Sequence, residues 1–155
     1  MNVRNIFPEF GPIRYIDEKD IEKPFQNRLY KKNKINLPEL LKLNRNNRHC
    51  LVFEDDDGKI LAFLVVDDKG DHLYLNLVEK NELFLDECKR RNAPTKLIDR
   101  AEDIARSRSH TKIEMQSMSH PKLVAYYKNL GYEKTGGTEL SGTYGKLINM
   151  KKSLT

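Results

Sequence analysis

Three short runs of strand-forming residues occupy the centre of the chain, at positions 50–54, 60–66 and 73–78. Segments rich in Asp and Gly, 55–58 and 67–70, separate these runs. Asp and Gly between two apolar runs are typical of hairpin turns. We therefore expect three consecutive antiparallel strands that form a meander.

The third run alternates with a period of two. Leu73, Leu75 and Leu77 occupy every second position, which predicts a strand with one strongly apolar face. The segment that follows, 79–92, fits either an extension of the sheet or a helical insertion. The pattern does not choose between these two alternatives.

A helical period begins after position 92. Pro94 is typical of the first turn of a helix. The apolar residues that follow recur at the spacing of one buried helical stripe, and they are Leu97, Ile98, Ala101, Ile104 and Ala105. The sequence therefore predicts a helix with one face packed on the sheet.

The last third of the chain continues the alternation of strands and helices. Residues 112–118 alternate apolar and polar positions, which predicts a strand reached by a crossover from the preceding helix. A second helix is predicted from Pro121 to Leu130, because Pro favours the first turn and Gly131 suits the position just after the end. We expect a strand from Tyr132 and a final strand over 147–150.

The first third of the chain has a weaker pattern. Residues 12–16 predict a short edge strand, and the charged segment 17–34 has an irregular but mostly helical period. Residues 37–43 predict another helix, with Asn36 as its N-cap. A chain of 155 residues lies in the common range for one domain, so we expect a single α/β domain over residues 1–155.

Composition and charge exclude several classes of protein. The two cysteines, Cys50 and Cys88, lack the spacing of a metal site or of a disulfide framework. The N-terminus lacks the apolar run of a signal peptide, and no segment approaches a membrane span, so we expect a cytoplasmic protein with no metal. The net charge of +5 favours anionic partners, but nucleic acid is not favoured because no binding motif accompanies the basic residues.

Residues in the second half resemble the GCN5-related N-acetyltransferase (GNAT) family. The segment 121–136 is similar to the family's helix and strand A-x-x-L-Y-x-x-x-G-F, with Tyr127, Gly131 and Tyr132 at the matching positions. Residues 95–105 resemble the helix after the family's pyrophosphate loop, and residues 112–116 resemble the strand expected next. The resemblance covers roughly residues 50–150 and implies a mostly antiparallel mixed sheet of about six or seven strands flanked by about four helices.

The resemblance also implies a place for acetyl-CoA. In the family, the fourth and fifth strands splay apart to admit acetyl-CoA, and an R-x-x-G-x-G/A loop binds its pyrophosphate at a helix N-terminus. Here the loop corresponds to residues 89–94, without either glycine and with Pro94 in place of an N–H donor. Asn92 could adopt a positive φ in place of glycine, and nearby cations could bind phosphate through their side chains. We expect weakened coenzyme A binding through Arg90, Arg91, Asn92, Ala93, Thr95 and Lys96.

Three residues are candidates for catalysis by this resemblance. Tyr127 matches the family tyrosine that protonates the departing thiolate, although a core aromatic would fit the same position. Glu79 is the nearest equivalent of the family's general base, or else an exposed turn carboxylate. His120 could transfer a proton near neutral pH, or simply flank the helix.

Two functions follow from the resemblance. The first is an N-acetyltransferase, an acyltransferase that moves an acetyl group from acetyl-CoA to a primary amine, either on a small molecule or on a protein lysine or N-terminus. The second is a catalytically silent domain with the same fold, which has lost acetyl-CoA binding and binds a protein partner. A homodimer is compatible with either function.

Overall fold

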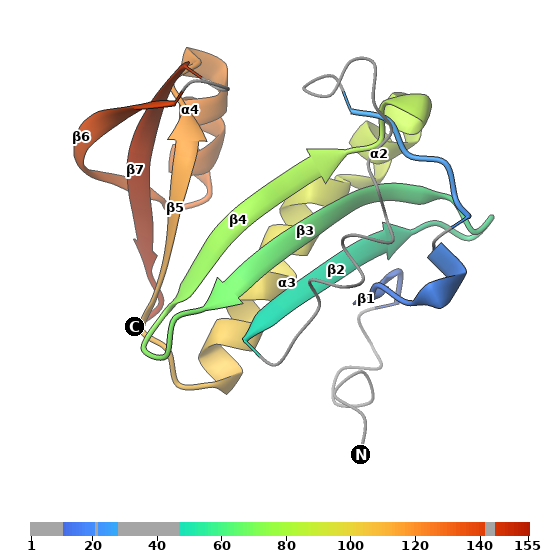
Figure 1. Cartoon of the computed structure of the whole chain (residues 1–155), viewed down its shortest axis with the longest axis horizontal. Helices are drawn as coiled ribbons and strands as arrows, with labels where there is room; N and C mark the ends of the chain where they lie inside the picture. Colours follow the sequence, from blue (N-terminus) through green and yellow to red (C-terminus); the bar gives the residue numbers. More distant parts are fainter. Residues whose placement is uncertain (1–10, 21, 28–46, 142–144) are drawn as a thin grey trace.

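The computed structural model of the chain describes residues 11–20, 22–27, 47–141 and 145–155. Its centre is a seven-stranded mixed sheet with the strand order β1-β2-β3-β4-β5-β7-β6 (Figure 1). The strands are β1 (Ile13–Tyr15), β2 (Arg48–Glu54), β3 (Ile60–Asp68), β4 (Leu73–Lys80), β5 (Lys112–Met118), β6 (Glu133–Ser141) and β7 (Gly145–Ser153). The predicted mixed α/β fold is confirmed.

One pair of neighbouring strands in this sheet is parallel. β4 and β5 run in the same direction, whereas the other neighbouring pairs are antiparallel. A parallel pair needs a crossover connection, and helix α3 (Ala93–Ser107) supplies it here. The meander of β2, β3 and β4 and the crossover into β5 agree with the sequence prediction.

The helices α2 (Leu85–Arg91), α3 and α4 (Pro121–Asn129) are the α-helices of the described residues. In Figure 1, α3 lies behind β2, β3 and β4, and α4 lies behind β5 and β7. The ambiguous segment 79–92 is an insertion of helix after the strand, since β4 ends at Lys80 and a short 3-10 helix, η5 (Glu82–Phe84), leads into α2. The helix predicted at 37–43 lies outside the described residues.

The predicted stripe of α3 forms the main core against the sheet. Leu97, Ile98, Ala101, Ile104 and Ala105 are all buried, and they pack in one cluster with residues of β2 to β5 and β7. A second, smaller cluster lies on the face of the sheet away from α3 and includes Phe25 and Phe63. The sheet is therefore covered on one face by helices and on part of the other face by N-terminal residues.

A β-bulge in β4 corrects the predicted alternation of its leucines. Val65 of β3 pairs with Leu77, and the next residue, Val66, pairs with Leu75, so Asn76 is the extra residue. Leu75 packs in the cluster under α3, but Leu77 packs in the cluster on the opposite face. The prediction of one apolar face was wrong because an extra residue shifts the side-chain alternation by one position.

The N-terminal segment is partly extended rather than helical. The predicted edge strand is β1, and a short 3-10 helix, η3 (Glu18–Asp20), follows it. The prediction of a mostly helical segment is wrong for residues 22–27, which contain no helix. The ring of Phe25 packs against Phe63 with 4.9 Å between centroids, and Pro24 restricts the residue before it to extended conformations. The remainder of 17–34 lies outside the described residues, apart from 17–20.

No helix among the described residues is long and apolar enough to cross a membrane.

Candidate functional site

The sheet opens between β4 and β5. These strands pair only where Leu73, Tyr74 and Leu75 meet Ile113, Glu114 and Met115. Beyond this point β4 continues alongside β3, and β5 continues alongside β7. Figure 1 shows the two strands diverging from their paired ends. The splay therefore separates residues 76–80 of β4 from residues 116–118 of β5.

Glu79 lies on the β4 side of this splay. It follows the bulge, so it shares the face of Leu77, away from α3. Its side chain is buried, with 8% exposure, inside the strand. The alternative of an exposed turn carboxylate was therefore wrong.

Burial dominates the electrostatics of Glu79. It raises the pKa of Glu79 from 4.5 to about 7, against the lowering effect of a hydrogen bond from Asn27. The Asn27 amide nitrogen donates to the Glu79 carboxylate, and more weakly to the carbonyl of Lys80 at 3.4 Å. A carboxyl with a pKa near 7 can accept a proton at neutral pH and release it again.

Tyr127 lies on the helix side of the sheet. It comes from α4, is 8% exposed and packs in the core cluster under α3. Burial raises the pKa of Tyr127, and the nearby Tyr126 and Glu79 raise it further.

Three tyrosines meet around α4, and their hydroxyl groups differ. The Tyr126 hydroxyl hydrogen bonds to that of Thr95 at 2.7 Å, and the Tyr132 hydroxyl donates to Glu102 at 3.3 Å. The hydroxyl of Tyr127 has no hydrogen-bond partner within the described part of the chain. The Tyr127 ring is held edge-on by both neighbours, with centroids 5.2 Å from Tyr126 and 6.0 Å from Tyr132.

His120 sits at the start of α4. It is the N-cap residue, and its Nδ1 accepts a hydrogen bond from the N–H of Lys122 at 3.2 Å. The side chain is exposed. Capping satisfies one of the free N–H groups of the first turn, so this histidine has a structural task at the end of the helix.

The N-terminus of α3 has the backbone turn that the sequence suggested. Asn92 adopts the left-handed conformation, with φ 54° and ψ 44°, and joins α2 directly to α3. Its N–H donates to the carbonyls of Cys88 and Lys89 in α2. Since Pro94 has no N–H, the start of α3 offers fewer backbone donors to a phosphate than a glycine-rich loop does.

Cations surround this helix start. Arg90 and Lys96 are exposed and Arg91 is half-buried. The Arg91 guanidinium and the Lys96 ammonium both lie over the Phe53 ring, 5.3 Å and 5.9 Å from its centroid. These contacts hold two positive charges beside the N-terminus of α3, where they complement the positive end of the helix in binding an anion.

Two other predicted contacts have structural partners. Ala93 is fully buried in the core cluster, and the Thr95 hydroxyl bonds to Tyr126 in α4. The bond between Thr95 and Tyr126 links the first turn of α3 to α4. The structure therefore brings Arg90, Arg91, Asn92 and Lys96 together at the surface, whereas Ala93 is buried and Thr95 is half-buried.

A cavity of about 260 Å³ lies beside the paired ends of β4 and β5. It is lined by Tyr74, Glu114, Met115, Gln116, Thr135, Asn149 and Met150. Gln116 donates to the side-chain oxygen of Asn149 at 2.9 Å. Amide, hydroxyl and carboxyl groups thus line much of the cavity, which suits a polar molecule.

Comparison with protein families gives one assignment. A family model described as an acetyltransferase (GNAT) domain matches residues 22–154. The chain belongs to the GNAT acetyltransferase family. Among curated proteins, no sequence matches the chain.

Solved structures with the GNAT fold superpose on most of the chain. Ard1 from Thermoplasma volcanium has a TM-score of 0.72 at 16% identity, over 92% of this chain and 97% of that one. An aminoglycoside 6'-N-acetyltransferase complexed with coenzyme A has a TM-score of 0.65 at 14% identity, over 92% and 97%. The spermidine/spermine N-acetyltransferase SpeG from Vibrio cholerae has a TM-score of 0.65 at 15% identity, over 92% and 91%. At these identities the similarity shows the fold alone.

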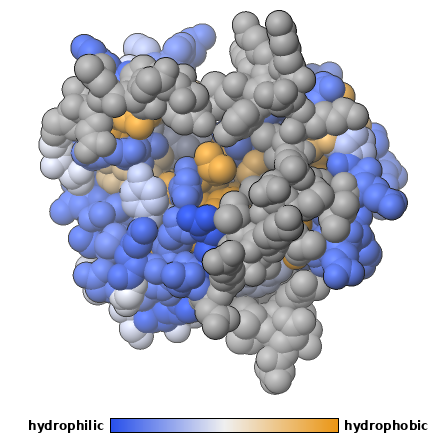
Figure 2. Space-filling model, in the orientation of Figure 1, coloured by the Kyte–Doolittle hydropathy of each residue, from blue (hydrophilic) through white to orange (hydrophobic). Residues whose placement is uncertain are grey.

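Within this GNAT domain, sequence reasoning missed Asn27 and the partner of Thr95. Asn27 lies 52 residues from Glu79 in the chain, in a segment with no recognisable motif. Figure 2 shows apolar residues near the centre of the open face, over β4, with hydrophilic residues around them.

Proposed function

We propose that this GNAT domain is an N-acetyltransferase that moves an acetyl group from acetyl-CoA to a primary amine. The observation that carries the proposal is the buried carboxyl of Glu79, whose pKa is raised to about 7 at the edge of the splay. A buried carboxyl with a strongly raised pKa beside the splay is a candidate for acid–base catalysis. We infer that Glu79 is the general base.

Glu79 has the properties that aminolysis of a thioester requires. A primary amine is mostly an ammonium ion at neutral pH and must lose a proton before or as its nitrogen bonds to the acetyl carbon. The Glu79 carboxylate takes this proton from the acceptor, directly or through water. As the new C–N bond forms, the C–S bond breaks and its electron pair goes to sulfur.

Tyr127 is the group that we propose protonates the leaving sulfur. Its phenol O–H remains neutral because burial raises its pKa, so it can donate a proton to the thiolate. Glu79 and Tyr127 come from opposite faces of the sheet. This arrangement lets the acceptor enter from the open face and the thioester from the helix face. His120, which is exposed and engaged in capping, is the weaker candidate for proton transfer.

The cations at the start of α3 are the groups that would hold the pyrophosphate. Acetyl-CoA, when bound, supplies the activated acetyl group. Arg90, Arg91 and Lys96 would bind its phosphates through side-chain charge, because the N–H of Asn92 is used by α2 and Pro94 has none. Binding through exposed charges is more sensitive to salt than binding through backbone amides.

Acetyl-CoA binding is the first test. Ligand at about 100 times its dissociation constant stabilises a protein by about 2.7 kcal/mol, which raises the Tm of a domain of this size by several degrees. The double variant Arg90→Glu, Arg91→Glu should lose this shift, and Arg106→Glu at the other end of α3 should keep it. No shift with millimolar acetyl-CoA would favour the catalytically silent alternative.

Turnover is the second test. Free coenzyme A released from acetyl-CoA can be measured against a panel of polyamines, aminoglycosides and peptides with free lysines or N-termini. An acceptor that raises release above the rate of hydrolysis identifies the substrate class. Release that Glu79→Gln leaves unchanged would show that another group takes the proton.

A further inference from the structure

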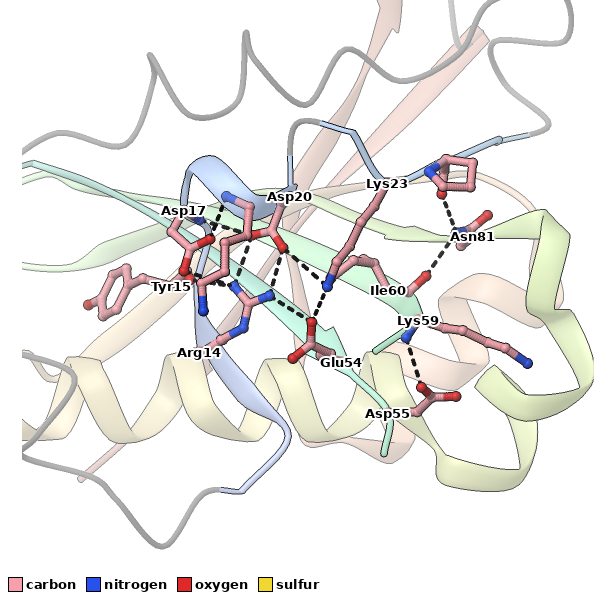
Figure 3. Close-up of polar contacts among 12 residues, drawn as sticks. Arg14, Tyr15, Asp17, Asp20, Lys23, Glu54, Asp55, Lys59, Ile60 and Asn81 are labelled. Carbon is pink, nitrogen blue, oxygen red and sulfur yellow. Dashed lines mark hydrogen bonds and ion pairs between the residues drawn. The ribbon is translucent and has the colours of Figure 1, made fainter. Parts of the chain in front are cut away.

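Asn81 is fully buried at the end of β4 and uses all of its amide group. Its oxygen accepts from the N–H groups of Gln26 at 3.2 Å and Leu83 at 3.1 Å. Its nitrogen donates to the carbonyls of Pro24 at 3.1 Å and Ile60 at 2.8 Å. In Figure 3 the Asn81 amide lies between the Ile60 carbonyl and the N-terminal segment. One side chain thus joins three separate parts of the chain.

These bonds fasten the segment 24–27 to the end of the sheet. Besides the two contacts with Asn81, the carbonyl of Gln26 accepts from the N–H of Glu82 at 2.7 Å. The ring of Phe25 packs on Phe63, which pairs with Glu79 across the two strands. The segment is therefore held by Asn81 on one side and by an aromatic contact on the other.

Asn27 is the next residue of this fastened segment. Its amide nitrogen donates to the Glu79 carboxylate. A neutral amide donor stabilises the charged form of a carboxylate without neutralising it. The position of Asn27 thus affects how readily Glu79 stays ionised.

We propose that Asn81 is a positioning residue for the general base, because it holds the segment that presents Asn27 to Glu79. This inference rests on the proposed function only for the role of Glu79 as general base. The link from Asn81 through Asn27 to Glu79 is a property of the fold. Asn81 touches no reacting atom. Its role is to keep one hydrogen-bond donor directed at the carboxylate.

Other charged groups near Glu79 do not replace this donor. Burial raises the pKa of Glu79, the charge of Glu82 raises it further, and the hydrogen bond from Asn27 and the charge of Lys80 lower it. Tyr127 comes from α4 on the other face of the sheet, and it is neutral because burial raises its pKa. Lys80 is exposed and acts through solvent, so the Asn27 amide is the main local group that favours ionisation.

The test is a direct titration of Glu79 by NMR of its side-chain carboxyl, with Glu79→Gln to assign the signal. Asn27→Leu removes the donor and should raise the pKa of Glu79 by about one unit, the size expected for one hydrogen bond to a charged group. Asn81→Ser should also raise the pKa of Glu79. Val52→Ala is the control. It opens a cavity in the core cluster that contains Phe25 and Phe63 and touches neither the Asn27 amide nor the Asn81 amide, so the pKa of Glu79 should stay unchanged.

A third variant tests the link without opening the core. Gln26→Pro, at an exposed position, removes the N–H that Asn81 accepts and should give a smaller shift in the same direction. Gln26→Pro replaces Asn81→Ser in the test if Asn81→Ser does not fold. An unchanged Glu79 titration in Gln26→Pro and in any folded Asn81 variant, beside a shift in Asn27→Leu, would overturn the role of Asn81. An unchanged titration in Asn27→Leu would overturn the whole link.

The rate measurement separates this inference from the proposed function. If Glu79 is the base, kcat/KM of Asn27→Leu should fall about tenfold well below pH 7 and change little above pH 9, because only the ionised fraction changes. A shifted NMR titration with an unshifted rate profile would leave the positioning link in place and remove Glu79 as the base. A loss of rate equal at all pH values would mean that Asn27 acts on something other than the ionisation of Glu79.

Discussion

Two buried carboxylates in the N-terminal half of the sheet have opposite electrostatics. Asp20 is fully buried and Glu79 nearly so, with 8% exposure. Burial alone would raise the pKa of both, but the pKa of Asp20 is lowered and that of Glu79 is raised to about 7. The difference between them is the charge of their partners.

Asp20 belongs to a network of opposite charges. Arg14 donates to both of its oxygens, at 2.9 Å and 2.6 Å, and also to Glu54 at 2.9 Å. Lys23 pairs with Glu54 as well, and Figure 3 shows both cations between the two carboxylates. Among the described residues, the side chain that hydrogen bonds to Glu79 is the neutral amide of Asn27. A positively charged partner keeps a buried carboxylate ionised, so that the carboxylate serves as part of a structural ion pair. Without such a partner, a buried carboxylate can take a proton.

Glu79→Gln should produce the largest effect of any substitution in this comparison. The amide cannot accept the proton of the acceptor, so kcat should fall by about 100- to 10,000-fold, measured with the acceptor found in the panel. Glu82→Gln is the control; it removes a nearby negative charge and should keep kcat within a few-fold. An equal loss in both variants would mean that overall negative charge, and not the Glu79 carboxylate, matters.

Tyr127→Phe tests the other face of the splay. The substitution keeps the ring contacts and removes the phenol, so kcat should fall by about 10- to 1000-fold while the Kd of acetyl-CoA and the Tm stay close to the original values. Tyr132→Phe, which loses a bond to Glu102, should lower the unfolding free energy by about 1 kcal/mol and leave kcat unchanged. Full turnover in Tyr127→Phe would assign the proton donor to solvent or another residue.

Asp20→Asn should affect stability and not the rate profile. It leaves the Arg14 guanidinium without its main partner, and breaking a buried pair costs about 4 kcal/mol of unfolding free energy, measured by urea denaturation. Asp17→Asn, on a carboxylate 3.7 Å from Arg14, should cost under 1 kcal/mol. A pH-rate midpoint that moves in Asp20→Asn would show that the two carboxylates are coupled.

The pH dependence of stability tests the raised pKa of Glu79 directly. Because the folded pKa of Glu79 lies near 7 and the ordinary value is 4.5, its contribution to stability is fully present below about pH 4.5 and is lost as pH rises through 7. Glu79→Gln should therefore be more stable than the original protein by about 3 kcal/mol at pH 8, and equal to it near pH 4. Parallel curves of unfolding free energy against pH would contradict the raised pKa.

The fold could be predicted from the sequence where the apolar period is regular. The alternation over 112–118 gave the bounds of β5 (Lys112–Met118), and the stripe from Leu97 to Ala105 gave the buried face of α3. Asn92 was identified as a residue that could adopt a positive φ, and it does so. These features are local, so they depend on residues close together in the chain.

Features that depend on distant contacts could not be predicted. The bulge at Asn76 interrupts an apparently regular run of leucines, and only pairing with β3 reveals it. Asn27 meets Glu79 across 52 residues, so no local pattern could indicate their contact. The residues of the candidate site were largely named from the family motif, but their environment required the structure.

The extra residue at position 76 reverses which alternate side chains of β4 face the helices. Upstream of it, odd-numbered residues of β4 face the helices; downstream, odd-numbered residues face away from them. Deleting that one residue would leave the pairing of Leu77 with Val65 and of Leu75 with Val66 in place, so Glu79 and Val78 would keep the faces they have now. Straightening the strand with Asn76 retained would instead turn every side chain from 77 to 80 to the opposite face together, so β4 should tolerate loss of residue 76 better than loss of the bulge.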